Sequence, residues 1–383
     1  MQTTLEILDT LVGFDTVSHK SNLALAAFAE TFLRDRGFTV HKIPSPCGTK
    51  MGLYAQKGPA EGNGVLLSAH TDVVPVEGQD WTRDPFRLTR EGDRVYGRGT
   101  TDMKGYVAAV LALADQVAQD DLREPLKIVL SYDEEVGCVG LQQMLVRLAP
   151  LMGTPRACFV GEPTQMQVAI GHKGKAALRA LCHGQAGHSA LAPHFVNALH
   201  LATDFAAELR ALQDRYAADG ARDAAYSVPY STFHVGQISG GRALNIVPDQ
   251  AELVFEYRHL AQDCSKVILD HIAAAAHRVG ASYQDRFPQA RIEVEQYNAY
   301  PGLEVAQTKA IVGYAQRLAQ TNSSTKVAFG TEAGFFDELG IPTVVCGPGC
   351  MQGQGHKPDE YLELGQLAAC TAMMNQIAAD LRA

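Results

Sequence analysis

Apolar residues recur along the first half of the chain with the spacing of alternating helices and strands. Near the N-terminus, Leu5, Leu8, Leu11 and Val12 recur at helical spacing and predict an amphipathic first helix. Short apolar runs such as VLLSA at 65–69 are typical of buried strands in a parallel sheet. The pattern predicts helices over 22–37, 106–117 and 141–148, and strands over 65–69, 126–132 and 157–160. This alternation favours an α/β fold, a mostly parallel sheet flanked by helices.

The pattern changes after about residue 174. An alternating strand over 175–183 precedes a helix near 197–219, strands over 231–239 and 251–259, and a helix over 266–279. This order predicts a smaller α+β unit with its helices on one face of a sheet. The α/β pattern then returns, with a helix near 308–319, a strand over 343–346 and a last helix from Leu364. We therefore expect one domain of residues 1–174 and 285–383, interrupted by an inserted domain of residues 175–284.

The composition is that of a soluble globular protein. Apolar residues make up 46% and charged residues 20% of the 383 positions. The net charge of −9 argues against a protein that grips nucleic acid through its phosphates. No run approaches the ~20 apolar residues of a membrane helix, and the N-terminus does not resemble a secretory signal. With eight scattered cysteines and no C-x-x-C pair, we expect reduced thiols, no membrane association and a cytoplasmic location.

The first candidate site residues follow the apolar run at 65–69. His70 and Asp72 are two positions apart, so their side chains project to the same side if the strand continues. A histidine with such a carboxylate suits a metal ligand and the residue that orients it. A strand-end histidine with a purely structural bond gives the same pattern, and this motif alone leaves both interpretations open.

A glycine-rich segment, YGRGTTDMKG at 96–105, brings in another carboxylate. It lacks the G-K-[ST] ending of a phosphate-binding loop and does not complete G-x-G-x-x-G. We therefore interpret it as a tight loop that carries Asp102 into a site. Lys104 in the same segment is most simply interpreted as a solvated surface charge.

Three adjacent acids, Asp133, Glu134 and Glu135, close the predicted strand over 126–132. Their charges repel one another, and either a cation or exposure to water offsets that repulsion. Short acidic runs are most often solvated turns. In a functional site, by contrast, one carboxylate binds a metal while its neighbour handles protons.

Two more candidates occupy similar places. Glu162 follows the apolar run ACFV, and His356 lies in a glycine-rich loop after the last apolar strand. Functional groups of α/β sheets gather at the carboxyl ends of the strands, so we expect these side chains to meet. The candidate set is His70, Asp102, Glu135, Glu162 and His356. Two imidazoles and three carboxylates suit zinc, cobalt or manganese, and one bridging carboxylate would leave open positions on two metals.

Five ordered motifs give the chain a resemblance to the metallopeptidase family M20. They are, in chain order, LLSAHTDVVP, YGRGTTDMKG, SYDEEVG, GEPT and GQGHKPDEY. Together they cover nearly the whole chain and are far more specific than any one motif. The resemblance implies a catalytic metal-binding domain and an inserted dimerisation (lid) domain, through which a homodimer forms.

The resemblance also implies a role for each matching residue. It implies two divalent metal ions, zinc above all, with cobalt able to substitute. His70 and Glu162 would hold one ion, Glu135 and His356 the other, and Asp102 would bridge them. Asp72 would orient His70, and Glu134 would act as general base and later as acid.

Residues outside the metal set resemble positions that contact the substrate. His188 resembles a residue that reaches the active site of a partner subunit and stabilises the oxyanion there. Asn245 and Arg258 resemble substrate-contacting positions, and an arginine suits a carboxylate, although a turn and a surface ion pair explain them equally simply. Thr331 and Glu332 lie in GTEAG, which favours the members that deacetylate acetylornithine, and we expect both at the substrate site.

The implied activity is hydrolysis of an N-acyl amino acid, first of all N2-acetyl-L-ornithine, to L-ornithine and acetate, as in arginine biosynthesis. Succinyl-diaminopimelate, another acylated amino acid or a dipeptide remain alternative substrates. A non-catalytic binding protein of the same fold is an alternative from another class. Two departures from the family pattern, Cys350-Met351 for Ser-Ile and Gly355 for a common Ala, leave the ligands intact but can reshape the pocket.

Overall fold

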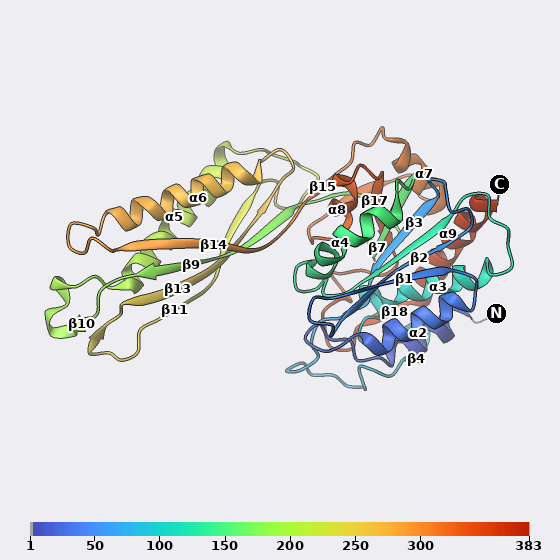
Figure 1. The fold of residues 1–383 in the computed structure, drawn as a ribbon, viewed down its shortest axis with the longest axis horizontal. Helices are drawn as coiled ribbons and strands as arrows, with labels where there is room; N and C mark the ends of the chain where they lie inside the picture. Colours follow the sequence, from blue (N-terminus) through green and yellow to red (C-terminus); the bar gives the residue numbers. More distant parts are fainter. Residues whose placement is uncertain (1–2, 383) are drawn as a thin grey trace. The chain divides into compact units, whose positions relative to one another are not determined.

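A computed structural model describes residues 3–382 and divides them into two units, each with its own sheet (Figure 1). Unit 1 runs up to His172 and includes Leu303–Val327 and the residues from Thr331 onward, and unit 2 comprises Lys173–Gly302 and Ala328–Gly330. The inserted segment is therefore longer than the expected 175–284. The physical reason is the strand β14 (Arg291–Tyr300), which pairs along β9 (Gly174–His183) and so belongs to unit 2.

The main sheet of unit 1 is parallel at its centre and antiparallel towards its edges. Among the described residues it has nine strands, in the order β1-β2-β6-β3-β7-β17-β8-β15 with β16 beside β8. The strands are β1 (Thr39–Pro44), β2 (Met51–Lys57), β3 (Val65–His70), β6 (Leu126–Ser131), β7 (Ala157–Pro163), β8 (Val168–His172), β15 (Leu303–Glu304), β16 (Ser324–Val327) and β17 (Thr343–Gly347). β3 runs parallel to β6 and β7, and β7 runs parallel to β17, whereas β1, β2 and β15 join antiparallel.

Helices cover both faces of this sheet. They are α1 (Thr4–Val12), α2 (Leu23–Arg34), α3 (Gly105–Gln116), α4 (Val139–Met152), α7 (Ala310–Leu318), α8 (Ala333–Glu338) and α9 (Leu364–Arg382). α3 packs on β3 and β7, and α1, α2 and α9 pack against α3. α4 packs on β1, β2 and β6, and right-handed crossovers place it on the face opposite α3. The predicted α/β class, a mostly parallel sheet flanked by helices, is confirmed, and no helix among the described residues is long and apolar enough to span a bilayer.

The central strands are short apolar runs because both of their faces are covered. Every residue of β3, β6, β7 and β17 is buried, as expected for the middle of a parallel sheet. Close packing extends to the end of β7, where a Cβ on Gly161 would lie 2.0 Å from the ring of Tyr106 in α3. The ring of Tyr106 therefore packs directly against the backbone near the carboxyl end of β7.

A small antiparallel sheet in unit 1 joins two distant parts of the chain. It has the order β18-β5-β4, formed by β4 (Thr89–Glu91), β5 (Arg94–Tyr96) and β18 (Tyr361–Glu363). Tyr96 at the end of β5 lies opposite Tyr361 at the start of β18. The loop that follows β5 and the loop that precedes β18 therefore leave the sheet at the same end.

Unit 2 is an antiparallel sheet with two helices on one face (Figure 1). The sheet has the order β11-β13-β9-β14, with β11 (Thr232–Gly240) and β13 (Gln250–His259) beside β9. The helices are α5 (Ala198–Asp219) and α6 (Ser265–Ala281), and a smaller pair of strands, β10 (Gly187–His188) and β12 (Ile246–Val247), flanks the turn η2 (Ser189–His194). Buried residues of the two helices, such as Phe205 and Ile272, pack against Leu178 and Phe255 of the sheet.

Candidate metal centre

The parallel strands of unit 1 bring the predicted ligands to one edge of the sheet. His70 is the last residue of β3, Glu135 lies in the turn after β6, Glu162 lies in β7, and His356 lies in the loop after β17. These strands run in the same direction, so their carboxyl ends lie side by side. The arrangement follows from strand order, and it explains why residues far apart in sequence meet.

His70, Asp102 and Glu162 form the first group of potential metal ligands, with their ligand atoms within 4.8 Å of one another. His70 Nε2 lies 3.1 Å from Asp102 Oδ1 and 3.7 Å from Glu162 Oε1, and all three residues are buried. His70 Nδ1 lies 3.0 Å from the carbonyl oxygen of Asp72. A proton on Nδ1 satisfies that carbonyl, so Nε2 can present its lone pair to a metal ion.

Asp102, Glu135 and His356 form the second group. His356 Nε2 lies 3.0 Å from Asp102 Oδ2 and 3.0 Å from Glu135 Oε2. The first group uses Oδ1 of Asp102 and the second uses Oδ2, so one carboxylate faces both groups. Two groups with a shared carboxylate are the arrangement expected of a bridged pair of metal ions.

Asp102 reaches the site from the short helical turn η1 (Thr100–Lys104), which follows β5. Gly99 before it has a φ of 82°, and a Cβ there would lie 2.7 Å from Val73 Cγ1. The peptide bond between Asp102 and Met103 is cis. The interpretation of Lys104 as a solvated charge is wrong: its side chain is buried, and its amine donates to the carbonyl of Phe14 at 2.7 Å, because η1 folds inward under α1.

The centre concentrates negative charge in a buried place. Burial and then the charge of Asp102 raise the pKa of Glu135 to about 7, and the same two effects raise the pKa of Glu162 well above its usual value. For Asp102, hydrogen bonds from His356 and His70 outweigh burial and hold the pKa below its usual range. Hydrogen bonds from His356 to Asp102 and Glu135 raise the pKa of His356 to about 10. Crowded carboxylates of this kind gain stability from a nearby positive charge.

The donor set fits divalent metal ions. Glu135 Oε1 and Glu162 Oε1 are buried and have no hydrogen-bond partner among the described residues. A buried carboxylate oxygen without a partner carries a large desolvation cost unless a cation or donor satisfies it. The nitrogen and oxygen ligands, with no cysteine among them, are typical of zinc and related ions. Metal binding by these residues therefore agrees with both chemistry and geometry.

Asp72 lies behind His70 and organises the acidic turn. It accepts hydrogen bonds from Ser18 Oγ at 2.7 Å, from Glu134 N at 3.1 Å and from Glu135 N at 3.3 Å. Its carboxylate also lies 3.6 Å from His70 Nδ1. Sequence reasoning missed Ser18, because its link to Asp72 spans 54 residues and leaves no local pattern.

Glu134 is partly buried beside the ligand Glu135. Burial, together with the charges of Glu135 and Glu332, raises the pKa of Glu134 well above its usual value. The thiol of Cys138 donates to Glu134 Oε1 at 3.3 Å. Sequence reasoning did not single out Cys138, although it lies four residues beyond Glu134 at the start of α4.

The structure places Thr331 and Glu332 in unit 1, where both are buried. Ser131 Oγ donates to Glu332 Oε2 at 2.9 Å, and Glu332 Oε1 has no hydrogen-bond partner among the described residues. Burial raises the pKa of Glu332 to about 7, although the bond from Ser131 lowers it. The hydroxyl of Thr331 accepts at 3.0 Å from the backbone N of Ala333, the first residue of α8.

His188, Asn245 and Arg258 belong to unit 2, whereas the candidate metal ligands belong to unit 1. His188 is exposed, and its Nδ1 accepts from Ala190 N at 3.1 Å. Asn245 is exposed, and its carbonyl accepts from Ser189 N. Arg258 donates from Nε to Glu256 at 3.0 Å, the ion pair that a purely structural role would give.

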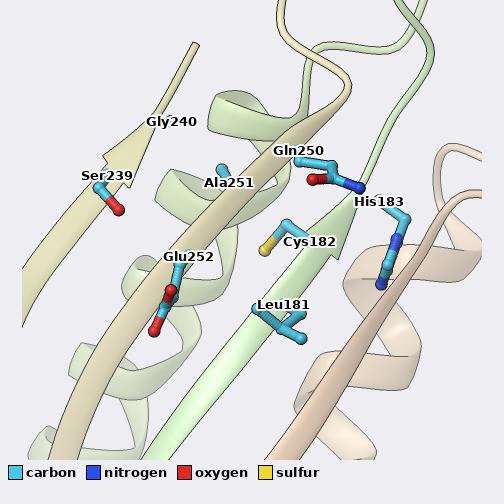
Figure 2. A pocket seen from close by; sticks show the side chains of 8 residues that line it. All are labelled: Leu181, Cys182, His183, Ser239, Gly240, Gln250, Ala251 and Glu252. Atoms are coloured by element: carbon cyan, nitrogen blue, oxygen red, sulfur yellow. The ribbon is translucent and has the colours of Figure 1, made fainter.

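A surface hollow of about 260 Å³ lies elsewhere, on the sheet of unit 2 (Figure 2). It spans β11, β13 and β9, and none of the predicted site residues lines it. Its lining residues are Leu181, Cys182, His183, Ser239, Gly240, Gln250, Ala251 and Glu252. The hollow therefore shares no residue with the two ligand groups of unit 1.

Solved structures share this fold over nearly the full chain. An M20 family metallo-carboxypeptidase from Sulfolobus solfataricus superposes with a TM-score of 0.79 at 18% identity, covering 99% of each chain. A dinuclear metal binding peptidase from the M20 family of Bacillus subtilis gives a TM-score of 0.69 at 16% identity, covering 99% of this chain and 97% of that one. At this identity the likeness establishes the fold alone.

Sequence comparison assigns the family. An acetylornithine deacetylase from Salmonella arizonae is 32% identical over 381 residues, covering 97% of this chain and 96% of that protein. Residues 66–380 match peptidase family M20/M25/M40, and this span includes every candidate metal ligand. The resemblance seen in the five motifs is thereby confirmed. The chain belongs to peptidase family M20/M25/M40.

Proposed function

We propose that this amide hydrolase uses two metal ions to cleave N2-acetyl-L-ornithine with water to L-ornithine and acetate. The observation that carries the proposal is the pair of ligand groups that share the carboxylate of Asp102. His70 and Glu162 would hold one ion, and Glu135 and His356 the other. A pair of divalent ions, zinc by preference, supplies Lewis-acid activation of water and of the scissile carbonyl when bound.

The protein's own residues would handle the protons. Glu134 has a raised pKa, which makes its carboxylate a better base for the proton of the attacking water. The same carboxyl group would then return the proton to the departing amine of ornithine. Asp72 would keep His70 in place. By accepting a hydrogen bond from the amide of Glu134, it would also hold the turn on which Glu134 lies.

Unit 2 would supply substrate contacts and the interface of a homodimer. His188 Nδ1 accepts a hydrogen bond from Ala190 N, so in the neutral ring the proton sits on Nε2. An exposed Nε2–H is a suitable donor for an oxyanion, which supports a role for His188 in the partner's active site. Arg258 engages Glu256 through Nε, and its terminal nitrogens would bind the carboxylate of the amino acid, whereas Asn245 would make a separate substrate contact.

The choice of acetylornithine rests on sequence. The curated relative from Salmonella arizonae is an acetylornithine deacetylase, and the chain carries Thr331 and Glu332 in the GTEAG motif. The metal ligands and Glu134 do not select the acyl group, because they act on the amide itself. Succinyl-diaminopimelate, other acylated amino acids and dipeptides are therefore the substrates against which the proposal is tested.

The test measures free ornithine and its relatives with purified protein. The protein is stripped with a chelator, reloaded with zinc or cobalt, and offered acetylornithine, succinyl-diaminopimelate, N-acetylmethionine and a dipeptide. We expect metal-dependent turnover that prefers acetylornithine. Preference for another compound would overturn the substrate but keep the mechanism, whereas bound metal without hydrolysis of any compound would indicate a binding protein.

A further inference from the structure

A buried carboxylate outside the ligand groups contacts the backbone that carries Asp102. Glu360 Oε1 accepts hydrogen bonds from Thr101 N at 2.9 Å and from Asp102 N at 3.1 Å, and Oε2 accepts from Gly99 N at 3.1 Å. Glu360 is 1% exposed. Three of the four backbone amides from Gly99 to Asp102, all but that of Thr100, thus donate to one side chain.

Arg98 fixes this carboxylate from the other side. Its guanidinium is fully buried and donates from Nη1 to Glu360 Oε2 at 2.6 Å. From Nη2 it donates to Gln79 Oε1 at 2.6 Å, and the amide of Gln79 donates to the carbonyl of His356 at 3.1 Å. The buried arginine therefore connects to the backbone of both Asp102 and His356.

Asp102 and His356, whose backbone atoms are contacted by this network, both belong to the second group of candidate ligands. Asp102 and His356 sit on loops that leave the β5–β18 pair at the same end, and Glu360 is the last residue before β18. Gly97 N donates to the carbonyl of Glu360 at 2.9 Å, which closes the connection between the loops. His356 has a φ of 61°, a conformation that a non-glycine residue keeps only where its surroundings enforce it.

We propose that Glu360 is a positioning residue that sets the separation between Asp102 and His356. It thereby tunes the affinity of the second ligand group for its metal ion. This inference rests on the proposed metal centre. The Glu360 side chain is not itself among the ligand groups and acts through the backbone amides of Thr101 and Asp102. Groups that orient metal ligands typically change metal affinity or activity ~10–100-fold when they are lost.

The test compares Glu360→Gln with two other variants. Glutamine keeps the shape of the Glu360 side chain, but its N–H₂ group would face backbone N–H donors that need an acceptor. Glu360→Asp keeps the charge beside Arg98 but is one methylene too short to hold the same amides, and it serves if the Gln variant does not fold. The control is Asp115→Asn, which removes the carboxylate of a less buried arginine pair, with Arg36, at the opposite end of α3.

Metal-free proteins are titrated with Co²⁺ and Zn²⁺ against a chromophoric chelator, and the visible spectrum of the Co²⁺ form is recorded. For Glu360→Gln we expect one of the two ions to bind ~10–100-fold more weakly, with a changed Co²⁺ spectrum. At saturating metal, kcat should fall more than KM rises. Asp115→Asn should keep wild-type affinity and spectrum even if its thermal stability drops.

Wild-type affinity and spectrum in a folded Glu360→Gln or Glu360→Asp protein would overturn the proposal. So would an equal loss in Asp115→Asn, because the effect would then be general destabilisation. A wild-type protein that binds no pair of ions would instead contradict the metal centre itself. The two failures are therefore distinguishable from the wild-type titration alone.

Discussion

Single carboxylates at this centre serve several neighbours at once. Asp72 accepts from Ser18, Glu134 and Glu135 while its own carbonyl faces His70, and Asp102 presents one oxygen to each ligand group. A buried carboxylate has about four lone-pair directions, so such sharing fills its capacity and fixes its rotamer. Loss of one of these oxygens therefore disturbs several partners together.

Replacement of Glu134 separates proton transfer from metal binding. Glu134→Gln keeps the size and the backbone bond to Asp72 but cannot take a proton from water. We expect turnover to fall ~10²–10⁴-fold, the usual contribution of a general base, while both ions remain bound. Metal analysis and steady-state kinetics on the same sample check this. More than a tenth of wild-type activity would remove Glu134 from the role.

Cys47 offers a pH-dependent prediction away from the metal centre. Hydrogen bonds from Ser45 and Thr49 lower the pKa of the exposed Cys47 thiol to about 7. The thiolate is the reactive form, so alkylation of Cys47 should accelerate as the pH rises through about 7 and level off above it.

Peptide mapping after iodoacetamide treatment at several pH values measures this rate. Cys264, also exposed, is the internal comparison and should react more slowly than Cys47 at pH 7. Thr49→Val removes one of the two hydroxyl donors and should move the Cys47 profile to higher pH. Equal rates for the two thiols at pH 7 would contradict the prediction.

Local sequence revealed the residues that touch the site but not those that support them. His70 and Glu162 were predictable because each ends an apolar strand, where α/β sheets place functional groups. Glu360 acts on Asp102 across 258 residues and through backbone amides, which leave no mark in a side-chain pattern. Lys104 was misjudged because a single lysine in a polar loop does not reveal that the loop folds inward.

At the scale of elements, a strand could be predicted from the sequence where both of its faces are buried. The strands covered on both faces, β3, β6, β7 and β17, are uniform apolar runs and were predictable. β14 escaped prediction although Ile292 and Val294 alternate with charged residues, because it is a half-exposed edge strand. Its absence from the predicted order is the reason that the expected insertion ended too early.

Gly161 tests how much the packing of α3 on β7 contributes to the stability of the protein. A Cβ there would overlap the Tyr106 ring at 2.0 Å, and Tyr106 is fully buried and donates to the carbonyl of Phe159. Gly161→Ala should therefore lower the free energy of unfolding by ~1–3 kcal/mol, the usual cost of overpacking. Denaturant unfolding of the metal-free protein, followed by circular dichroism, measures the change.

Gly313 provides the matched control for this substitution. It lies inside α7, and an added Cβ there would meet no described atom within 4 Å beyond its chain neighbours and the nearby backbone of its own helix. Gly313→Ala should leave stability unchanged or raise it by ~0.5–1 kcal/mol, because alanine is the better helix former. If Gly161→Ala behaved like this control, the close approach of Tyr106 to β7 would be of no consequence for stability.

At the scale of the whole molecule, the candidate metal ligands fall in one of the two units. All five candidate ligands lie in unit 1, whereas unit 2 has its own core between one sheet and two helices. A ligand that binds only the native state stabilises the part that must be folded to bind it. Metal removal should therefore affect the two units unequally.

The unequal effect of metal removal on the two units can be measured because the single tryptophan, Trp81, lies in unit 1. With zinc at ~100 times its Kd, binding adds ~2.7 kcal/mol, which raises the unfolding midpoint of a unit of this size by ~5–10 °C. Trp81 fluorescence should show that rise, and chelator should abolish it. Hydrogen exchange of buried amides in α5 and α6 should change far less, since these helices pack within unit 2. Equal shifts in both units would mean that the units unfold as one, and no shift at Trp81 would mean that the five ligands do not bind the metal.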